Sequence, residues 1–279
     1  MPENMKREEI AIISTPAIGN LVPAVEFATH LINHHHHRIS VAILVISMPQ
    51  RPLIDDYVIS RASTPHIRFI QIPPVDPPPP HQYNSTIEFI SLHIQNHKPK
   101  IKQTLKNLTT LVGIFIDMFC TPMIDVANDL GIPCYLFFAS PAAYLGFVLH
   151  LTNLPATESV SQTTELTTVP SYANSVPSNV LPSFCIKKNE SEQQLNAFEM
   201  VKEVGLSVEL RLDSRDKGSD LVLAEEVERG VRELMDGGDD GELRKKVKDM
   251  SEKSRKALME NGSSFGSLGD LINMLLSNV

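Results

Sequence analysis

The stretch that decides the fold is residues 111–151, LVGIFIDMFCTPMIDVANDLGIPCYLFFASPAAYLGFVLHL. It opens with an apolar run of strand length, Leu111–Ile116, and a second such run follows at Cys134–Phe138. Between them, Thr121–Leu130 has apolar residues at helical spacing and is closed by a glycine. The last part, Pro141–Leu151, predicts a helix with proline in its first turn. Strand, helix, strand and helix in this order indicate an α/β fold.

The residues upstream repeat the same alternation. Apolar runs of strand length occupy Ile10–Ser14, Ile39–Ser47 and Ile67–Ile72, and apolar residues recur at helical spacing within Leu21–Leu31. We expect Ser85–Leu108 to form one long amphipathic helix. Because the strands are almost continuously apolar, they should form a parallel sheet that is covered on both faces, as in a Rossmann-like domain.

Composition changes abruptly near Lys188. All 20 prolines, 10 histidines, five tyrosines and three cysteines precede that point, whereas the last 91 residues carry 20 acidic and 13 basic side chains. Either this is an ordinary boundary between a loop-rich domain and a helical tail, or an internal segment is missing here. We predict a first domain over residues 1–185 and a mostly helical part over 186–279. The second part is expected to contain these elements: helices at Glu192–Val204, Ala224–Met235, Glu242–Glu260 and Ser267–Leu276, and a short strand at Val208–Leu212.

Charge and apolar content exclude several classes of protein. The net charge of −8 argues against a nucleic-acid partner, because phosphate backbones select basic surfaces. No apolar run reaches the roughly 20 residues of a membrane span, and the first residues lack the apolar core of a signal peptide. The cysteines Cys120, Cys134 and Cys185 have no metal-binding spacing, so we interpret them as buried thiols. These features predict a cytoplasmic protein with no membrane anchor of its own.

A candidate site follows from two strand ends. The turn Ser14–Pro23 comes after the first strand, and Asp117 ends the run that begins at Leu111. In an open α/β sheet, ligands bind beyond the carboxyl ends of the strands, so both segments can face one crevice. The alternatives stay open at this point: an ordinary strand-to-helix turn, and a helix cap at Asp117.

The histidines favour a structural role over a metal site. Four of them are consecutive at His34–His37, where neighbouring side chains on a helix point in different directions, so we expect a solvated loop. His93 and His97 have the spacing of ligands on a helix, but no third ligand accompanies them.

Five stretches, taken in order, resemble the plant family that transfers sugar from a UDP-sugar to small phenolic or terpenoid acceptors (family 1, flavonoid and phenylpropanoid type). These stretches are STPAIGNLVPAVEFATHL (14–31), VAILVISMPQRPLIDDYVIS (41–60), the run 112–151, EQQLNAFEMVKEVGLSVEL (192–210) and ELRKKVKDMSEKSRKALMENGSSFGSLGDLI (242–272). The resemblance covers nearly all of the chain. It implies a GT-B fold, in which two Rossmann-like domains face each other. Residues 1–185 would be the acceptor-binding domain, and residues 186–279 an incomplete, mostly helical remnant of the UDP-sugar-binding domain with the C-terminal helices.

The chain departs from the family pattern in two places. The donor signature, which begins Trp-Xaa-Pro-Gln and centres on His-Xaa-Gly-Trp-Asn-Ser, is absent, because the chain has no tryptophan. Only its last two positions remain, as Glu192 and Gln193, which the resemblance assigns to the sugar hydroxyls. The second departure is Asn20, where the family has the histidine that acts as general base and is held by an aspartate at the position of Asp117. An amide cannot take up a proton near neutral pH, whereas an imidazole can.

The resemblance implies transfer of a hexose to a hydroxyl of a small aromatic acceptor such as a flavonoid. Glucose is the hexose that we expect. The reaction would invert the anomeric carbon and use a UDP-sugar as co-substrate, with no metal and no further cofactor, in a monomer. Acceptor contacts carried over from the family are Ile18, Phe119, Ala139, Tyr144 and Phe147. Because the donor signature is missing, we expect impaired transfer. An acceptor-binding module without catalysis and a non-functional truncated product remain alternatives. In the family the last helix packs back on the first domain, and we expect the apolar residues of 267–276 to do so here.

Overall fold

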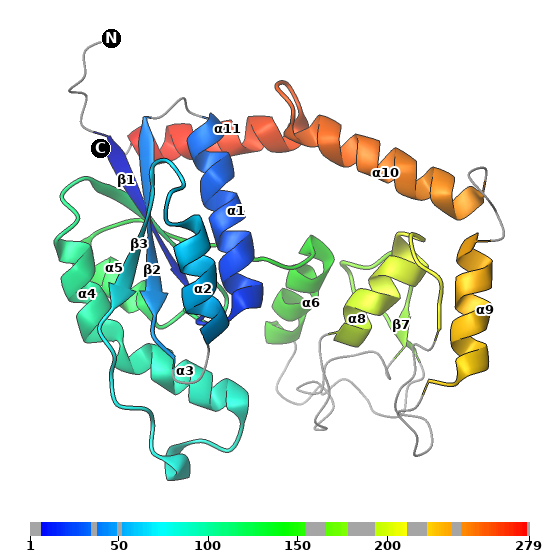
Figure 1. Cartoon of the computed structure of the whole chain (residues 1–279), viewed down its shortest axis with the longest axis horizontal. Coiled ribbons are helices and arrows are strands. Elements are labelled where there is room, and N and C mark those ends of the chain that lie inside the picture. Colours follow the sequence, from blue (N-terminus) through cyan, green and yellow to red (C-terminus); the bar gives the residue numbers. More distant parts are fainter. Residues whose placement is uncertain are drawn as a thin grey trace. The chain divides into compact units, whose positions relative to one another are not determined.

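The computed structural model describes residues 7–34, 38–48, 52–153, 166–177, 193–210, 222–235 and 241–277. The chain divides into two compact units (Figure 1). The first contains residues 1–139 together with the C-terminal residues 258–279, and the second contains residues 140–257. The compositional boundary predicted near Lys188 lies outside the described residues.

A five-stranded parallel sheet forms the centre of the first unit, in the order β3-β2-β1-β4-β5. The strands are β1 (Glu8–Ser14), β2 (Ile39–Ile46), β3 (Ile67–Ile72), β4 (Leu111–Ile116) and β5 (Cys134–Leu136). Every strand pairing in this sheet is parallel, which confirms the predicted Rossmann-like arrangement. The order of the strands reverses beside β1, because the chain returns from β3 to the other side of β1 to form β4.

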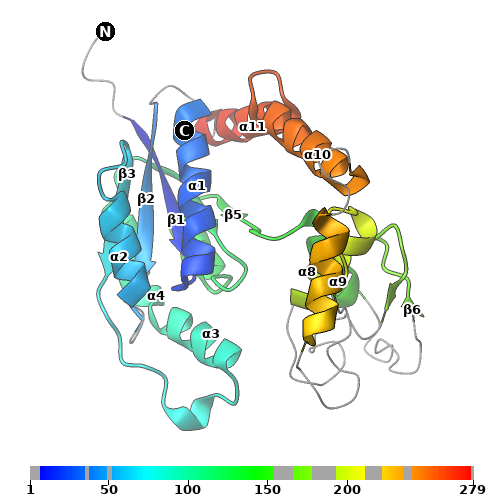
Figure 2. The same ribbon diagram turned by 45° about the vertical axis from the view of Figure 1, so that its right-hand side comes forward.

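Helices cover both faces of this sheet (Figures 1 and 2). One face packs against α1 (Ile18–His34) and α2 (Pro52–Arg61), and the other against α3 (Thr86–Asn96), α4 (Lys98–Lys106) and α5 (Met123–Leu130). Alternate residues of a strand point to opposite faces, so Ile10 and Ile12 join the first core while Ala11 and Ile13 join the second. This double burial explains why the strands are almost continuously apolar.

The helix expected over Ser85–Leu108 is two helices. It breaks at His97, which ends α3, and Pro99 stands in the first turn of α4. Proline lacks the backbone N–H that would continue the helical ladder, and its ring clashes with the preceding turn. Before α3, the proline-rich loop contains one 3-10 turn, η1 (Pro80–Gln82).

The last helix of the chain belongs to the first unit. α11 (Ser263–Ser277) packs on α1 and β4, and its Ile272 and Leu275 are fully buried in the same core as β1 and β2. This confirms the expected return of the C-terminal helix. The approach is close, because a Cβ added to Gly113 of β4 would lie 2.7 Å from Cδ2 of Leu275. Glycine at this strand position therefore leaves room for the leucine.

The second unit is mostly helical. Its elements are α6 (Ala142–Thr152), the antiparallel pair β6 (Leu166–Thr167) and β7 (Val176–Pro177), α8 (Gln193–Phe198) continued by the π-helical turn η3 (Glu199–Glu203), α9 (Ala224–Met235) and α10 (Glu242–Leu258). The strand expected at Val208–Leu212 is wrong for the residues that are described, because 208–210 form no strand. The rest of that range lies outside the described residues.

Candidate functional site

The site predicted from the sequence lies where β1 and β4 end side by side. The two strands are neighbours in the sheet, and their register pairs Ile13 with Ile116. The turn that leads from β1 into α1 and the turn that leads from β4 into α5 therefore meet at one edge. This edge is also where the strand order reverses, the usual place for a ligand in an open α/β sheet.

Asp117 joins the two turns through its carboxylate. Oδ1 accepts a hydrogen bond from the hydroxyl of Thr15 at 2.7 Å, and from the backbone N–H groups of Phe119 at 3.0 Å and Cys120 at 3.1 Å. Oδ2 accepts from the N–H of Thr15 and from the hydroxyl of Ser14, the latter at 3.3 Å. Five donors therefore converge on one carboxylate that is 5% exposed.

These bonds occupy both oxygens of Asp117 within the protein itself. The carboxylate ties the β1–α1 turn to the β4–α5 turn, and it also closes its own turn over residues 117–120. It does not cap α5, because that helix begins at Met123 with Pro122 at the N-cap position. The alternative that made Asp117 a cap of this helix is therefore wrong.

Asn20 lies in the first turn of α1, at the same edge. Its backbone N–H donates to the carbonyl of Ala17 at 3.0 Å, and its side chain is partly exposed. Among the described residues, no hydrogen bond joins the Asn20 amide to Asp117. The helix surface beside it is open: Ile18 is 36% exposed, and a Cβ added at Gly19 would meet no atom within 4 Å.

Two further acceptor contacts, Phe119 and Ala139, were expected in the first unit. Phe119 belongs to the β4–α5 turn and packs partly against the core formed with α3, α4 and α5. Ala139 is exposed in the segment that follows β5. The structure thus brings Asn20, Ile18, Asp117 and Phe119 to the adjoining turns of two neighbouring strands.

The remaining predicted residues belong to the second unit. Tyr144 and Phe147 of α6 are buried there, at 2% and 0% exposure, with ring centroids 6.4 Å apart. Gln193 is the first residue of α8, and Glu192 lies outside the described residues. Contact of these four residues with acceptor or sugar stays a prediction.

Sequence reasoning missed Thr15 and the setting of Cys120. Thr15 is 3% exposed and binds Asp117 through both its backbone and its hydroxyl. Its hydroxyl also lies 4.0 Å from Sγ of Cys120. Burial, reinforced by the charge of Asp117, raises the pKa of the Cys120 thiol well above its usual range. This confirms Cys120 as a buried thiol. Cys134 is only partly buried, and Cys185 lies outside the described residues.

The histidines that were weighed as metal ligands make structural contacts where they are described, and His35–His37 lie outside the described residues. His34 ends α1 and contacts α11, with Nε2 2.8 Å from the carbonyl of Phe265, so it is not part of a solvated loop. His93 and His97 are buried and face the carbonyls of Ser47 and His93, each at 2.8 Å. No cluster of three or more potential metal ligands occurs among the described residues.

Comparison with proteins of known sequence gives a consistent set of relatives. UDP-glycosyltransferase 43 of Pueraria montana var. lobata is 30% identical over 477 aligned positions, which cover 98% of this chain and 100% of that protein. UDP-glycosyltransferase 71K2 of Pyrus communis is 38% identical over 192 residues, or 64% of this chain. No protein-family model matches the chain.

Solved structures show the same fold. Medicago truncatula UGT71G1, solved with UDP-glucose, superposes with a TM-score of 0.84 at 24% identity, over 96% of this chain and 98% of that one. Phytolacca americana UGT2, solved with UDP-2-fluoro-glucose and pterostilbene, gives 0.72 at 18% identity, over 97% and 100%. These likenesses establish the GT-B type of fold.

The chain is much shorter than these relatives. The alignment with the Pueraria protein runs over 477 positions, whereas the chain has 279 residues, so a large part of that alignment contains no residue of this chain. It spans about two fifths of the length of the Pyrus relative, at 40%. No helix among the described residues is long and apolar enough to cross a membrane.

Proposed function

Since this chain belongs to the UDP-glycosyltransferases, we propose that it keeps the acceptor-binding half of their reaction and carries out little or no transfer. The reaction moves a hexose, glucose in the first place, from a UDP-sugar to a hydroxyl of a small aromatic acceptor. The acceptor oxygen bonds to the anomeric carbon from the face opposite to the diphosphate, and the bond from that carbon to UDP breaks. The family resemblance assigns no metal and no further cofactor to this step.

The observation that carries the proposal is the site between β1 and β4. Further strands flank these two on both sides in the sheet, and Asp117 fixes the two turns that meet there. Ile18 and Phe119 place apolar surface on those turns, and Gly19 leaves the space beside them open. Apolar walls with few polar groups suit an aromatic ligand.

The residues that stand where the family has its general base and the supporting aspartate favour an acceptor whose hydroxyl is acidic. The Asn20 amide has no basic nitrogen, and the carboxylate of Asp117 already accepts five hydrogen bonds. Neither group is suited to take the proton of an alcohol. A phenol, whose pKa lies near that of tyrosine at about 10, loses its proton far more readily than an aliphatic alcohol. We therefore propose phenolic acceptors.

The missing donor-binding signature supports the proposal that the chain carries out little or no sugar transfer. The tryptophan-containing signature of the family is absent from the sequence. In such transfers the groups that stabilise the departing diphosphate supply a large share of the rate. Without these groups, the chain would bind UDP-sugar weakly and would stabilise the departing diphosphate poorly.

Equilibrium dialysis of a flavonol against the whole chain tests acceptor binding. We expect binding that Ile18→Asp weakens about tenfold or more, because a carboxylate would face the ring. Ile59→Asp is the matched control, because Ile59 is an exposed isoleucine of α2, at 73% exposure, away from the site. Equal affinities for the two variants, or no binding by the unmodified chain, would refute the proposed site.

A further inference from the structure

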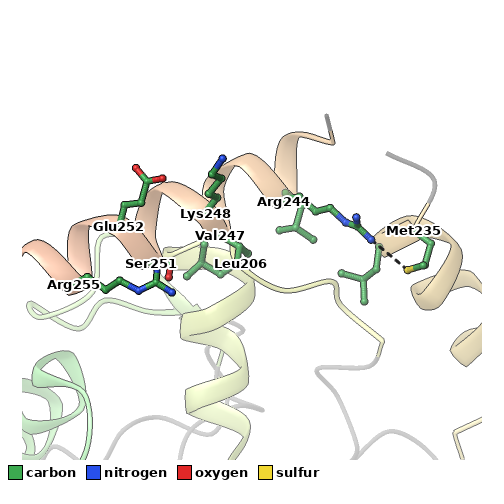
Figure 3. A pocket seen from close by; sticks show the side chains of 10 residues that line it. Leu206, Met235, Arg244, Val247, Lys248, Ser251, Glu252 and Arg255 are labelled. Carbon is green, nitrogen blue, oxygen red and sulfur yellow. Dashed lines mark hydrogen bonds between the residues drawn. The ribbon is translucent and has the colours of Figure 1, made fainter. Parts of the chain in front are cut away.

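A groove in the second unit lies between α10 and the segments before it (Figure 3). Its apolar lining consists of Leu206, Leu234, Met235, Leu243 and Val247, and it holds about 490 Å³. This volume admits several side chains. Charged side chains of α10 also line it: Arg244, Lys248, Glu252 and Arg255.

The helices that border the groove bury almost nothing. α10 has no buried residue along its length, and α9 buries only Gly230. On α9, Val227, Val231 and Leu234 are each more than 40% exposed and fall on one face by their spacing. A stable helix in water normally buries one apolar face.

The chain is also much shorter than a relative that it matches from end to end. The alignment with the Pueraria protein runs over 477 positions, whereas the chain has 279 residues, so many aligned positions have no residue here. The apolar residues of α9 and α10 are exposed within this chain. Exposed apolar surface favours association with another surface that covers it.

The two helices have opposite charge. α9 carries four acidic and two basic residues, whereas α10 carries three acidic and seven basic ones. The lining of the groove contains three cationic side chains and one carboxylate. The groove on α10 therefore suits an acidic helix with an apolar stripe, and α9 is such a helix.

From this complementarity we infer that a second copy of the chain covers the groove. The acidic α9 of each copy places Val227 and Val231 in the α10 groove of the other. The two contacts are equivalent, so they close a two-fold symmetric dimer and leave no free groove. This departs from the monomer expected from the family resemblance.

Sedimentation velocity over about a hundredfold range of concentration tests the dimer. We expect a concentration-dependent dimer that Val231→Glu and Val247→Glu each weaken about tenfold or more. Raising the salt concentration should also weaken it, because the helices carry opposite charges. Ile59→Glu, on the exposed surface of the first unit, is the matched control and should leave association unchanged. Circular dichroism would check that each variant keeps its helices.

Mixing the two variants gives the sharpest test. In a mixed pair, one contact combines both glutamates, while the other joins an unmodified α9 to an unmodified groove. The mixture should therefore associate more strongly than either variant alone. A chain that stays monomeric at every concentration, or a mixture that regains nothing, would overturn the inference.

Discussion

At the scale of single residues, Asp117 has a structural role that is independent of any reaction. Its carboxylate holds the ends of β1 and β4 through Ser14, Thr15 and two backbone N–H groups. Hydrogen bonds to a buried charged group contribute more than those between neutral groups. Asp117 therefore maintains the shape of the site even where no substrate is turned over.

Replacing this carboxylate should destabilise the first unit. Asp117→Asn places an amide NH2 group among donors, so we expect the free energy of unfolding to fall by about 2–3 kcal/mol. Asp125→Asn is the control, because Asp125 makes an ion pair with Lys98 while its side chain is 72% exposed, and its loss should cost less than about 1 kcal/mol. Urea unfolding followed by circular dichroism measures both. Similar losses for the two variants would contradict the role assigned to Asp117.

The buried His97 should make the fold sensitive to acid. Because a carbonyl only accepts, the ring of His97 donates from Nδ1 to the carbonyl of His93, and its buried Nε2 has no hydrogen-bond partner among the described residues. Burial lowers the pKa of His97 from its usual value, and the nearby His93 and Lys100 also lower it, against the opposite effect of the His93 carbonyl.

The sign of the pH effect follows from that shift. Below about pH 6.5 the unfolded chain binds a proton at this position that the folded chain does not. The free energy of unfolding therefore decreases as the pH is lowered below this value, and it levels off above it. Unfolding free energies at about pH 5.5 and 7.5 should differ less for His97→Leu than for the unmodified chain. His81→Gln, at an exposed histidine, should leave the difference unchanged. An acid sensitivity that His97→Leu does not reduce would count against this account.

Sequence reasoning located part of the site but not its bonding. The edge between β1 and β4 could be predicted, because apolar runs ended at Ser14 and Asp117 in a parallel sheet. The three donors that Ser14 and Thr15 direct at Asp117 could not be predicted, since they depend on how two turns more than 100 residues apart meet. Thr15 carried no signal beyond its place at a strand end.

At the scale of elements, α11 completes the core of the first unit. Leu268, Leu271 and Leu276 add to the fully buried Ile272 and Leu275. Each large apolar side chain that is fully buried contributes about 1.5–3 kcal/mol. The C-terminal helix therefore stabilises the sheet although it is distant in sequence.

A pair of substitutions in α11 separates packing from general helix effects. Leu275→Ala leaves a cavity against β4, so we expect the free energy of unfolding to fall by about 2–5 kcal/mol. Met274→Ala changes the neighbouring residue, which is 44% exposed, and should shift stability by less than about 0.5 kcal/mol. Chemical denaturation measures both, and a small effect of Leu275→Ala would show that α11 is only loosely attached.

The elements themselves were largely predictable because their apolar residues follow a clear period. Buried strands such as Ile39–Ile46 and the helical spacing of α1 and α5 were recognisable from the sequence. The break at His97 was missed because the apolar spacing continues across Pro99, so local backbone chemistry ended the helix. No strand forms over residues 208–210, where short apolar runs are ambiguous.

At the scale of the whole molecule, the chain combines a sheet unit that is covered on both faces with a helical unit that exposes much apolar surface. The first unit has two cores, one on each face of its sheet. In the second unit, α10 buries no residue. A sheet domain can bury its core against its own helices, whereas a helix with no packing partner leaves its apolar face exposed.

The most direct test of this account is release of UDP by the purified chain incubated with UDP-glucose and a flavonol that it binds. The account predicts release no faster than from a heat-denatured control, because the acceptor half is present and the donor signature is not. A full-length relative assayed in parallel would show that the conditions support transfer. UDP release together with formation of the flavonol glucoside, well above the denatured control, would contradict the central claim.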